Sequence, residues 1–247
     1  WRLSNAAKQG EELFRSDTAL LLRNAHLDTA VGTQLAITAH LRAGERPGSY
    51  VAQARGALDN AFREQLRAVG ATVVSYIPNN AYLVQATPEA ARRLAAMPRT
   101  QSVVPFEPYY KISPEVILAA VHQRPLPAGM LLNVITLPGE PLVSARELTK
   151  LGAEIVSDQP SPFGHLFTVR PEANSLVALA ASPVVQEIEV SHRRVLLTDL
   201  ARPRMGIATN SFAPNYLGLN GNNVLVTVAG SGVETTHPAL VGRVVVN

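Results

Sequence analysis

Apolar and polar residues alternate along residues 50–106 in a pattern that predicts short strands and helices. Tyr50–Ala54 shows the alternation of a strand. The apolar residues that follow recur every three or four positions, as on the buried face of a helix, and they are Leu58, Phe62, Leu66 and Val69. Further strands are predicted at residues 72–76, 81–86 and 101–106, and a second helix at 88–97. The predicted order is therefore β-α-β-β-α-β.

A repeat in the sequence indicates that this order occurs twice. The pattern L-x-x-x-G-A-x-x-V-S-x-x-P occupies Leu66–Pro78 and again Leu148–Pro160, an offset of 148 − 66 = 82. Pro-Glu-Ala at Pro88 recurs at Pro171, an offset of 171 − 88 = 83. Two long copies with nearly equal offsets favour a duplicated domain over a solenoid, which needs more repeats. We expect an α+β chain with two tandem ferredoxin-like (βαββαβ) domains.

These patterns divide the chain into five parts. An N-terminal arm at 1–47 is expected to be ordered and partly helical, because it carries the apolar run Leu20–Leu22. Copy one is placed at 48–112 and copy two at 129–197, with a proline-containing linker at 113–128 between them. The last part, 198–247, is expected to hold a linker and the start of a further domain.

One continuous apolar run stands out in the last part. Val224–Ala229 is rich in β-branched residues, as is typical of a strand buried on both faces in a parallel sheet. The run stops at Gly230-Ser231-Gly232, which predicts a sharp turn. In open α/β sheets, functional side chains lie where strands end and such loops begin.

Composition narrows the class of protein. A chain of 247 residues can form more than one core, and 47% hydrophobic residues indicate a globular protein. The net charge of +3 is too small to predict a nucleic-acid partner. The absence of cysteine excludes disulfides, a thiol nucleophile and a Cys-ligated zinc site. No apolar run approaches the roughly 18–20 residues of a membrane-spanning helix, and no motif predicts a metal or cofactor.

The run and turn at 224–238 resemble the first strand and loop of the subtilisin-like serine peptidases (subtilases). In that family an Asp-Ser/Thr-Gly turn follows the strand, and a Thr-His-Pro segment comes soon after. The matching residues are Ser231, Gly232, Thr236, His237 and Pro238. Upstream, copy one resembles a subtilase propeptide, a small ferredoxin-like domain. The resemblance implies tandem propeptide-type domains followed by the start of an α/β subtilisin-like domain.

The resemblance also implies that this chain lacks the catalytic groups. Gly230 occupies the position of the family's catalytic Asp, which orients the His that activates the Ser. The His-Gly-Thr and Gly-Thr-Ser segments that supply the other two groups do not occur in the sequence. His237 belongs to the Thr-His-Pro loop and is not expected to be catalytic. We therefore expect no activity of the chain itself, within a parent protein that is a peptidase.

The expected function is that of the N-terminal prodomain region of a secreted subtilisin-like endopeptidase. Such a region assists folding of the peptidase domain and inhibits it, so the expected partner is a subtilisin-like catalytic domain. The candidate inhibitory tail after copy two contains Arg194, Val195, Leu196 and Leu197. The same residues could instead extend the last strand and pack on the core. The alternative function is a non-catalytic assembly protein that pairs sheet edges with a partner or with its own copies.

Overall fold

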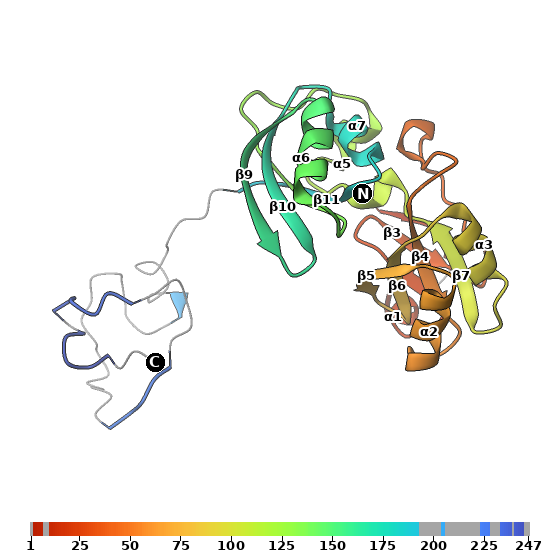
Figure 1. The fold of residues 1–247 in the computed structure, drawn as a ribbon, viewed down its shortest axis with the longest axis horizontal. Helices are drawn as coiled ribbons and strands as arrows, with labels where there is room; N and C mark the ends of the chain where they lie inside the picture. The colour runs from red at the N-terminus through yellow and green to blue at the C-terminus, as the bar shows by residue number, and fades with distance from the viewer. Residues whose placement is uncertain are drawn as a thin grey trace. The chain divides into compact units, whose positions relative to one another are not determined.

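The part of the chain that the structure describes contains both strands and helices. The computed structural model describes residues 2–6, 10–192, 204–205, 223–227, 233–238 and 240–244. The chain divides into two compact units, Trp1–Arg193 and Arg194–Asn247, which are described separately. The first unit contains three sheets with helices packed on them (Figure 1). The predicted α+β class is therefore confirmed.

The first four-stranded sheet is antiparallel and lies at residues 49–105. Its strands are β4 (Ser49–Ala54), β5 (Thr72–Ile77), β6 (Ala81–Gln85) and β7 (Thr100–Pro105), in the spatial order β5-β6-β4-β7. Helices α2 (Asn60–Ala68) and α3 (Pro88–Ala95) connect the strands and pack on one face. We call this part of the chain the first module.

Local sequence explains where the two helices of the first module begin and end. The Asp59 carboxylate accepts a hydrogen bond from Phe62 N at 2.9 Å, and the Thr87 hydroxyl accepts one from Ala90 N at 3.2 Å. Both side chains therefore cap the first turn of a helix. Gly70 follows α2 with φ +80°, a conformation that suits glycine and stops the helix. Phe62 and Leu66 are fully buried between α2 and the sheet, as the helical pattern predicts.

The second four-stranded sheet, at residues 132–190, is also antiparallel. Its strands are β8 (Leu132–Thr136), β9 (Ala153–Ser161), β10 (Gly164–Pro171) and β11 (Val185–Val190), in the order β11-β8-β10-β9. Helices α6 (Pro141–Lys150) and α7 (Leu176–Ala181) contribute Leu148 and Leu176 to its core. Counted in chain order, the strands lie side by side as 2-3-1-4 in both sheets. We call this part the second module.

The N-terminal arm consists mainly of strands. A three-stranded sheet is formed by β1 (Leu3–Ser4), β3 (Ala25–Asp28) and β2 (Ala19–Leu21), with a short helix α1 (Gly10–Phe14) and a 3-10 turn η1 (Ala39–Leu41). Among the described residues of the arm, the helical part is limited to α1 and η1. The run of leucines lies in a hairpin, because Leu22 and Ala25 exchange backbone hydrogen bonds around a turn at Arg23 and Asn24.

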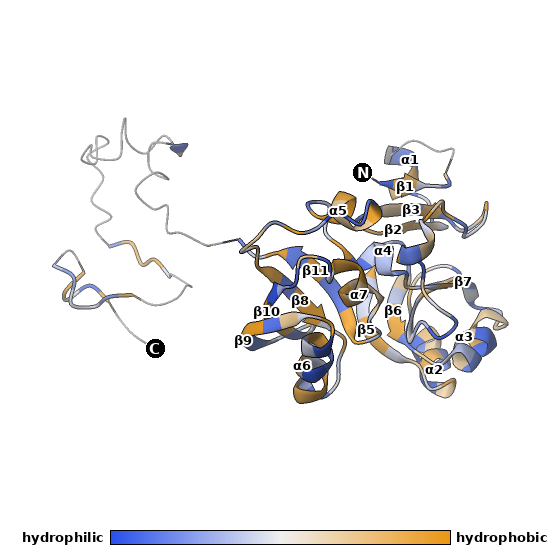
Figure 2. Ribbon diagram, turned by 90° about the horizontal axis from the view of Figure 1, so that it is seen from above, coloured by the Kyte–Doolittle hydropathy of each residue, from blue (hydrophilic) through white to orange (hydrophobic). Residues whose placement is uncertain are grey.

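The arm covers the face of the first sheet that α2 and α3 leave free. Leu20 and Leu27 of the arm and Val51 and Leu83 of the sheet are at most 1% exposed and belong to one core. The first sheet is therefore buried on both faces, with β1–β3 on one side and α2 and α3 on the other (Figure 2).

Residues 108–128 connect the two modules, and part of this connection is helical and buried. It contains α4 (Pro108–Lys111) and α5 (Ile117–Val121), and Ile117 and Ala120 are at most 1% exposed. The core that includes the arm continues through these residues into the second module. The linker predicted from prolines is therefore a structural part of the first unit, because its apolar residues bury themselves between the arm and α7.

The described residues of the second unit correct one prediction. Val224–Thr227 form no strand, and Val224, Leu225 and Val226 are 66%, 90% and 71% exposed. The physical reason is that a strand buried on both faces takes its hydrogen bonds and its apolar cover from neighbouring elements. The structure describes no such neighbour beside this segment.

Candidate functional site

The second sheet has one face that its helices do not cover. Residues paired directly across antiparallel strands project to the same face, so the register places Asn133 with Thr168 and Ile135 with Leu166 on this side. The register of β11 adds Glu187 and Glu189. All six side chains are half-buried. We call this surface, formed by Asn133, Ile135, Leu166, Thr168, Glu187 and Glu189, the open face.

The opposite face of the same sheet is packed against helices. Val134, Phe167 and Ile188 are at most 1% exposed and share a core with Leu148 of α6 and Leu179 of α7. This difference in burial identifies the open face as the accessible side of the sheet. The corresponding side of the first sheet is closed, because Val51, Gln53, Ala81 and Leu83 lie under the arm and are at most 1% exposed. The two modules therefore differ most in what covers this face.

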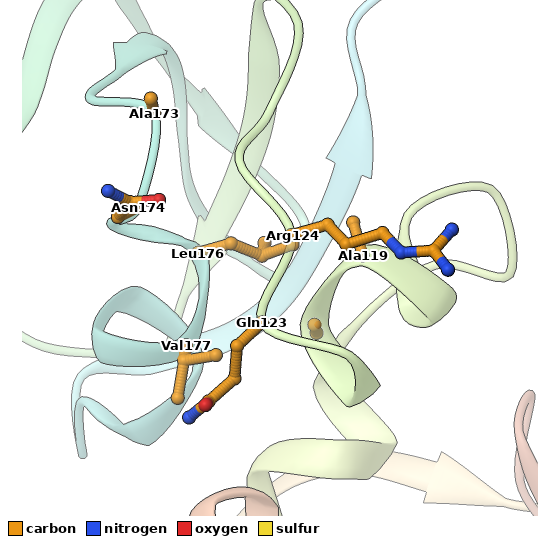
Figure 3. A pocket seen from close by; sticks show the side chains of 8 residues that line it. Ala119, Gln123, Arg124, Ala173, Asn174, Leu176 and Val177 are labelled. Atoms are coloured by element: carbon orange, nitrogen blue, oxygen red, sulfur yellow. The ribbon is translucent and has the colours of Figure 1, made fainter.

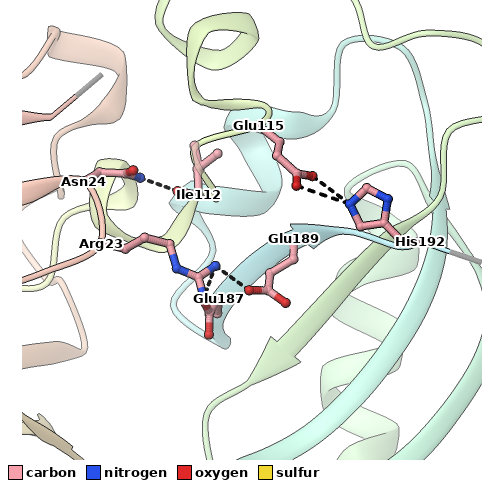
Figure 4. Close-up of polar contacts among 7 residues, drawn as sticks. All are labelled: Arg23, Asn24, Ile112, Glu115, Glu187, Glu189 and His192. Carbon is pink, nitrogen blue, oxygen red and sulfur yellow. Dashed lines mark hydrogen bonds and ion pairs between the residues drawn. The ribbon is translucent and has the colours of Figure 1, made fainter. Parts of the chain in front are cut away.

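Acidic side chains lie at the β11 end of the open face. Arg23, at the tip of the arm hairpin, forms ion pairs with Glu187, at 2.7 Å between Nη1 and Oε1, and with Glu189 (Figure 4). Burial raises the pKa of Glu187, and the positive charge of Arg23 opposes that rise. Removing water costs a carboxylate free energy that a nearby cation only partly restores. A positive charge beside Glu187 and Glu189, at the acidic end of the open face, is therefore stabilising.

Backbone and side-chain contacts hold the last strand of the second module where the chain leaves it. Ile112 forms a parallel bridge with Ile188, and Ser113 N donates a hydrogen bond to Ile188 O at 2.8 Å. His192 Nε2 lies 3.0 Å from Glu115 Oε2, just beyond β11 (Figure 4). All three contacts are made by residues of the connection between the modules. They fix the exit of the chain at the edge of the sheet that carries Glu187 and Glu189.

Asn24 anchors the arm to the same region. Its side-chain amide donates hydrogen bonds to the backbone carbonyls of Ile112 and Tyr109, the second at 3.3 Å, and the side chain is fully buried. These hydrogen bonds satisfy the buried amide nitrogen, whereas the buried Oδ1 of Asn24 has no hydrogen-bond partner among the described residues, which costs free energy. Arg23 and Asn24 together therefore link the arm hairpin to both the connection and β11.

A match to one family model covers part of this architecture. Residues 21–107 match a domain of unknown function, DUF8729. No curated protein and no solved structure matches the chain. The DUF8729 region begins at the last residue of β2 and ends just after β7, so it holds the turn and strand β3 of the arm hairpin together with the first sheet that the arm covers. The open face lies outside the DUF8729 region.

The second module contains one histidine–carboxylate pair outside the DUF8729 region. His165 Nε2 lies 3.0 Å from Asp158 Oδ2, on neighbouring strands, and the imidazole packs against Phe167 with 4.8 Å between ring centroids. A hydrolytic triad requires a nucleophile hydrogen-bonded to the imidazole. In the part of the chain that the structure describes, the imidazole of His165 has no hydroxyl partner, and the Thr136 hydroxyl donates instead to the backbone carbonyl of His165 at 3.3 Å. We therefore interpret the His165–Asp158 pair as a structural contact between neighbouring strands.

The cavity beside α7 and the metal-ligating side chains of the described residues give no second candidate site. A shallow pocket of about 390 Å³ lies between α5 and the start of α7, lined by Gln123, Arg124 and Asn174 among alanine, leucine and valine side chains (Figure 3). It contains no acid and no nucleophile. Within the described residues, no group of three His, Asp or Glu side chains could hold a metal ion. The described helices are also too short or too polar to cross a membrane.

The residues singled out by the sequence are only partly described. Gly230, Ser231 and Gly232 of the turn, and Arg194, Val195, Leu196 and Leu197 of the candidate tail, lie outside the described residues. Thr236, His237 and Pro238 lie in an exposed turn. In that turn the Thr236 hydroxyl donates a hydrogen bond to Glu234 at 3.3 Å, and His237 N donates one to Glu234 O at 3.2 Å.

Sequence reasoning did not identify the residues that define the open face. Neither Arg23 nor Glu187 belongs to a sequence motif. One signal was present: Glu187 and Glu189 are alternate residues of a predicted strand, so they project to one face. Arg23, which pairs with both, is 164 residues away from Glu187 in the chain, and no local sequence pattern can predict a contact over such a separation.

Proposed function

We propose that residues 48–192 are the prodomain region of a subtilisin-like serine peptidase, and that the second module docks on the peptidase domain through its open face. The single observation that carries this proposal is the open face itself. A prodomain of this type needs a sheet with one accessible side and a chain that leaves from its last strand. The second module has both features, and its exit is held beside the open face by Ile112 and Ser113.

We further propose that the two modules are ferredoxin-like domains that arose by duplication. The common strand order 2-3-1-4, the helices at equivalent places and the sequence repeat at an offset of 82 support this interpretation. The helix-stopping glycines also correspond, since Gly70 and Gly152 have φ of +80° and +82° after the first helix of each module.

The two modules would then have different roles. The first has its sheet face closed by the arm and serves as a scaffold, because a docking partner would have to displace Leu20 and Leu27 from a fully buried core. The second presents half-buried Ile135 and Leu166 at the centre of its free face, with the acids at one end. A peptidase surface with a basic residue facing Glu189 and apolar residues facing Ile135 and Leu166 would be complementary to it.

Inhibition would follow from the position of the exit. Residues after His192 would extend from the docked sheet into the substrate cleft and pair with its walls through their backbone. The chain itself would have no hydrolytic activity, because Gly230 cannot orient a histidine. A secreted parent enzyme is part of the same proposal.

The test uses the whole chain as an inhibitor of the mature peptidase domain from its own precursor. We expect the wild type to slow hydrolysis of a peptide substrate at micromolar concentration. Leu166→Arg on the open face should weaken inhibition at least tenfold, because it places an unpaired charge in a docked surface, at a cost of about 1.4 kcal/mol or more. The matched control is Leu142→Arg on α6, where the side chain is 72% exposed and lies away from the open face.

Three outcomes would contradict the proposal. One is a precursor gene that encodes no peptidase domain after the Thr-His-Pro segment. Another is a lack of inhibition by the wild-type chain at micromolar concentration. The third is equal inhibition by the wild type, the Leu166 variant and the Leu142 variant, provided that circular dichroism gives all three the same unfolding temperature.

A further inference from the structure

Strand β5 of the first module has a free outer edge. It is the end strand of the order β5-β6-β4-β7 and pairs only with β6 among the described strands (Figure 1). No hydrogen bond recorded for the described residues reaches Thr72–Ile77 from any other element. A row of unpaired N–H and C=O groups of this kind is a template for another strand.

The other edges of the two four-stranded sheets carry features that discourage pairing. Strand β9 has the charged residues Glu154 and Asp158 and the proline Pro160 along its free side. Proline lacks the N–H that a ladder needs, and charges on an edge oppose the approach of a second copy. Strand β11 is occupied by the backbone of Ile112 and Ser113.

Strand β7 is also limited as a docking edge. It ends in Pro105, and its Thr100 and Val104 side chains are buried. None of the exposed large apolar side chains on the described surface comes from β7. An incoming strand would therefore gain little apolar contact there.

Strand β5 has none of these protective features. Its sequence, Thr-Val-Val-Ser-Tyr-Ile, contains no charge and no proline and consists mainly of residues that favour strands. Val73 is 40% exposed and Tyr76 is 59% exposed. Both side chains would bury apolar area if a second strand paired alongside β5.

We propose that β5 pairs antiparallel with β5 of a second copy of this chain, joining two first modules into one continuous sheet. Two identical strands related by a two-fold axis form a closed, self-complementary contact. If β9 paired with its own copy, the negative charges of Glu154 and Asp158 would be brought together and would repel. A pair of β5 strands has no charged side chains and avoids this repulsion. The absence of charge on β5 thus favours its own copy over a partner selected by charge.

The expected dimer is weak and depends on concentration. The register of β5 shifts between Val73 and Ser75, so a regular outer ladder runs over only a few residues. Such a ladder buries less than the roughly 1,600 Å² of a standard stable interface. This inference does not rest on the proposed prodomain function, because the open face belongs to the other module.

Analytical ultracentrifugation of the full chain tests the proposal. The wild type should pass from monomer to dimer as its concentration rises, and Tyr76→Lys should remain a monomer at the highest concentration used. The matched control is Val156→Lys on β9, which is 46% exposed and should dimerise as the wild type does. A wild type that stays monomeric throughout, or a Tyr76→Lys variant that still dimerises, would overturn the proposal.

Cross-linking provides a second measurement that does not depend on how lysine affects folding. The chain contains no cysteine, so a single introduced thiol reports one position. Ser75→Cys should give a covalent dimer with a short bis-maleimide at concentrations where the wild type sediments as a dimer. Ser157→Cys on β9 should give much less. Equal cross-linking of the two variants would exclude β5 as the interface.

Discussion

Arg23 in the arm and Glu187 in β11 form an ion pair with 2.7 Å between Nη1 and Oε1. The arm closes one face of the first sheet, and this contact brings its hairpin to the free face of the second sheet. Surface pairs of this kind contribute little stability, about 0–1 kcal/mol, when both side chains are partly exposed. The main effect of the ion pair is therefore on the charge state of Glu187, whose side chain is more buried than that of Arg23.

The first prediction concerns that charge state. Burial raises the pKa of Glu187, so its contribution to stability is present below the ordinary glutamate pKa and is lost as the pH rises through the raised value. Removing the opposing cation with Arg23→Ala should raise the pKa of Glu187 further. Carbon-detected NMR titration of the carboxyl groups measures this directly. Arg99→Ala is the control, because Arg99 pairs with Asp59 and should leave the Glu187 titration unchanged.

The second prediction concerns Lys111, a buried cation in α4. Its side chain is 3% exposed, and its ammonium donates a hydrogen bond to Ser182 O at 2.8 Å. Burial lowers the pKa of Lys111 to about 8. Below pH 8 the folded protein holds a charge that water would solvate better. Between pH 8 and about 10.5 the folded state has lost this proton while the unfolded chain keeps it, so stability should rise.

The test compares unfolding by urea at intervals from pH 7 to pH 10.5. A shift of this size corresponds to about 3 kcal/mol across the whole window. Lys111→Met should remove the rise that is due to this group, and the variant should be at least as stable as the wild type at pH 7. The control is Lys150→Met at the exposed end of α6, which should keep the wild-type slope. The same slope in both variants would contradict the assignment to Lys111.

The order of strands and helices could be predicted because it depends on local periodicity. Leu66 and Leu148 recur at helical spacing in front of a glycine, and each is fully buried in the described structure. The boundaries of α2 were also readable, since Asp59 and Gly70 are residues that start and stop helices. The α+β class follows from these signals alone.

What the sequence could not show is which faces are covered. Gln53 is a polar residue in a strand and would normally be assigned to the solvent side, yet it is fully buried under the arm. Its partners lie 24 to 49 residues away, so no short pattern contains them. The same limit applies to Val224–Val226, whose apolar pattern predicts burial that requires neighbours from elsewhere. Residues of the candidate tail and of the Gly230 turn remain predictions.

The third prediction concerns the buried amide of Gln53. Its Nε2 donates to the carbonyls of Asn79, Asp17 and Ala19 at 3.0, 3.2 and 3.3 Å, and its Oε1 accepts from the Thr29 hydroxyl at 2.7 Å. Gln53→Leu would leave these buried groups without their partner, at a cost of about 1–3 kcal/mol. Hydrogen exchange should accelerate in β2 and β3. Gln101→Leu, in the half-buried part of β7, is the control and should leave exchange in the arm unchanged.

The last prediction uses the difference between the two cores. Leu66 and Leu148 are both fully buried, and truncating either to alanine should cost about 2–5 kcal/mol. Leu66 belongs to a core bounded by the first sheet and its own two helices, whereas Leu148 belongs to a core that continues through the connection into the arm. Leu148→Ala should therefore also loosen contacts near Leu20, and Leu66→Ala should not.

Native-state hydrogen exchange at a denaturant concentration well below the midpoint separates these two effects. Local opening free energies of the amides in β2 and β3 should fall in Leu148→Ala and stay near the wild-type values in Leu66→Ala, because exchange reports cooperative units and not only the global transition. Leu142→Ala, at a 72% exposed position on the same helix as Leu148, controls for helix propensity. Equal loosening of the arm in both core variants would contradict the prediction. It would mean that the core beneath α2 and α3 is not separate from the core that the arm, the connection and the second module share.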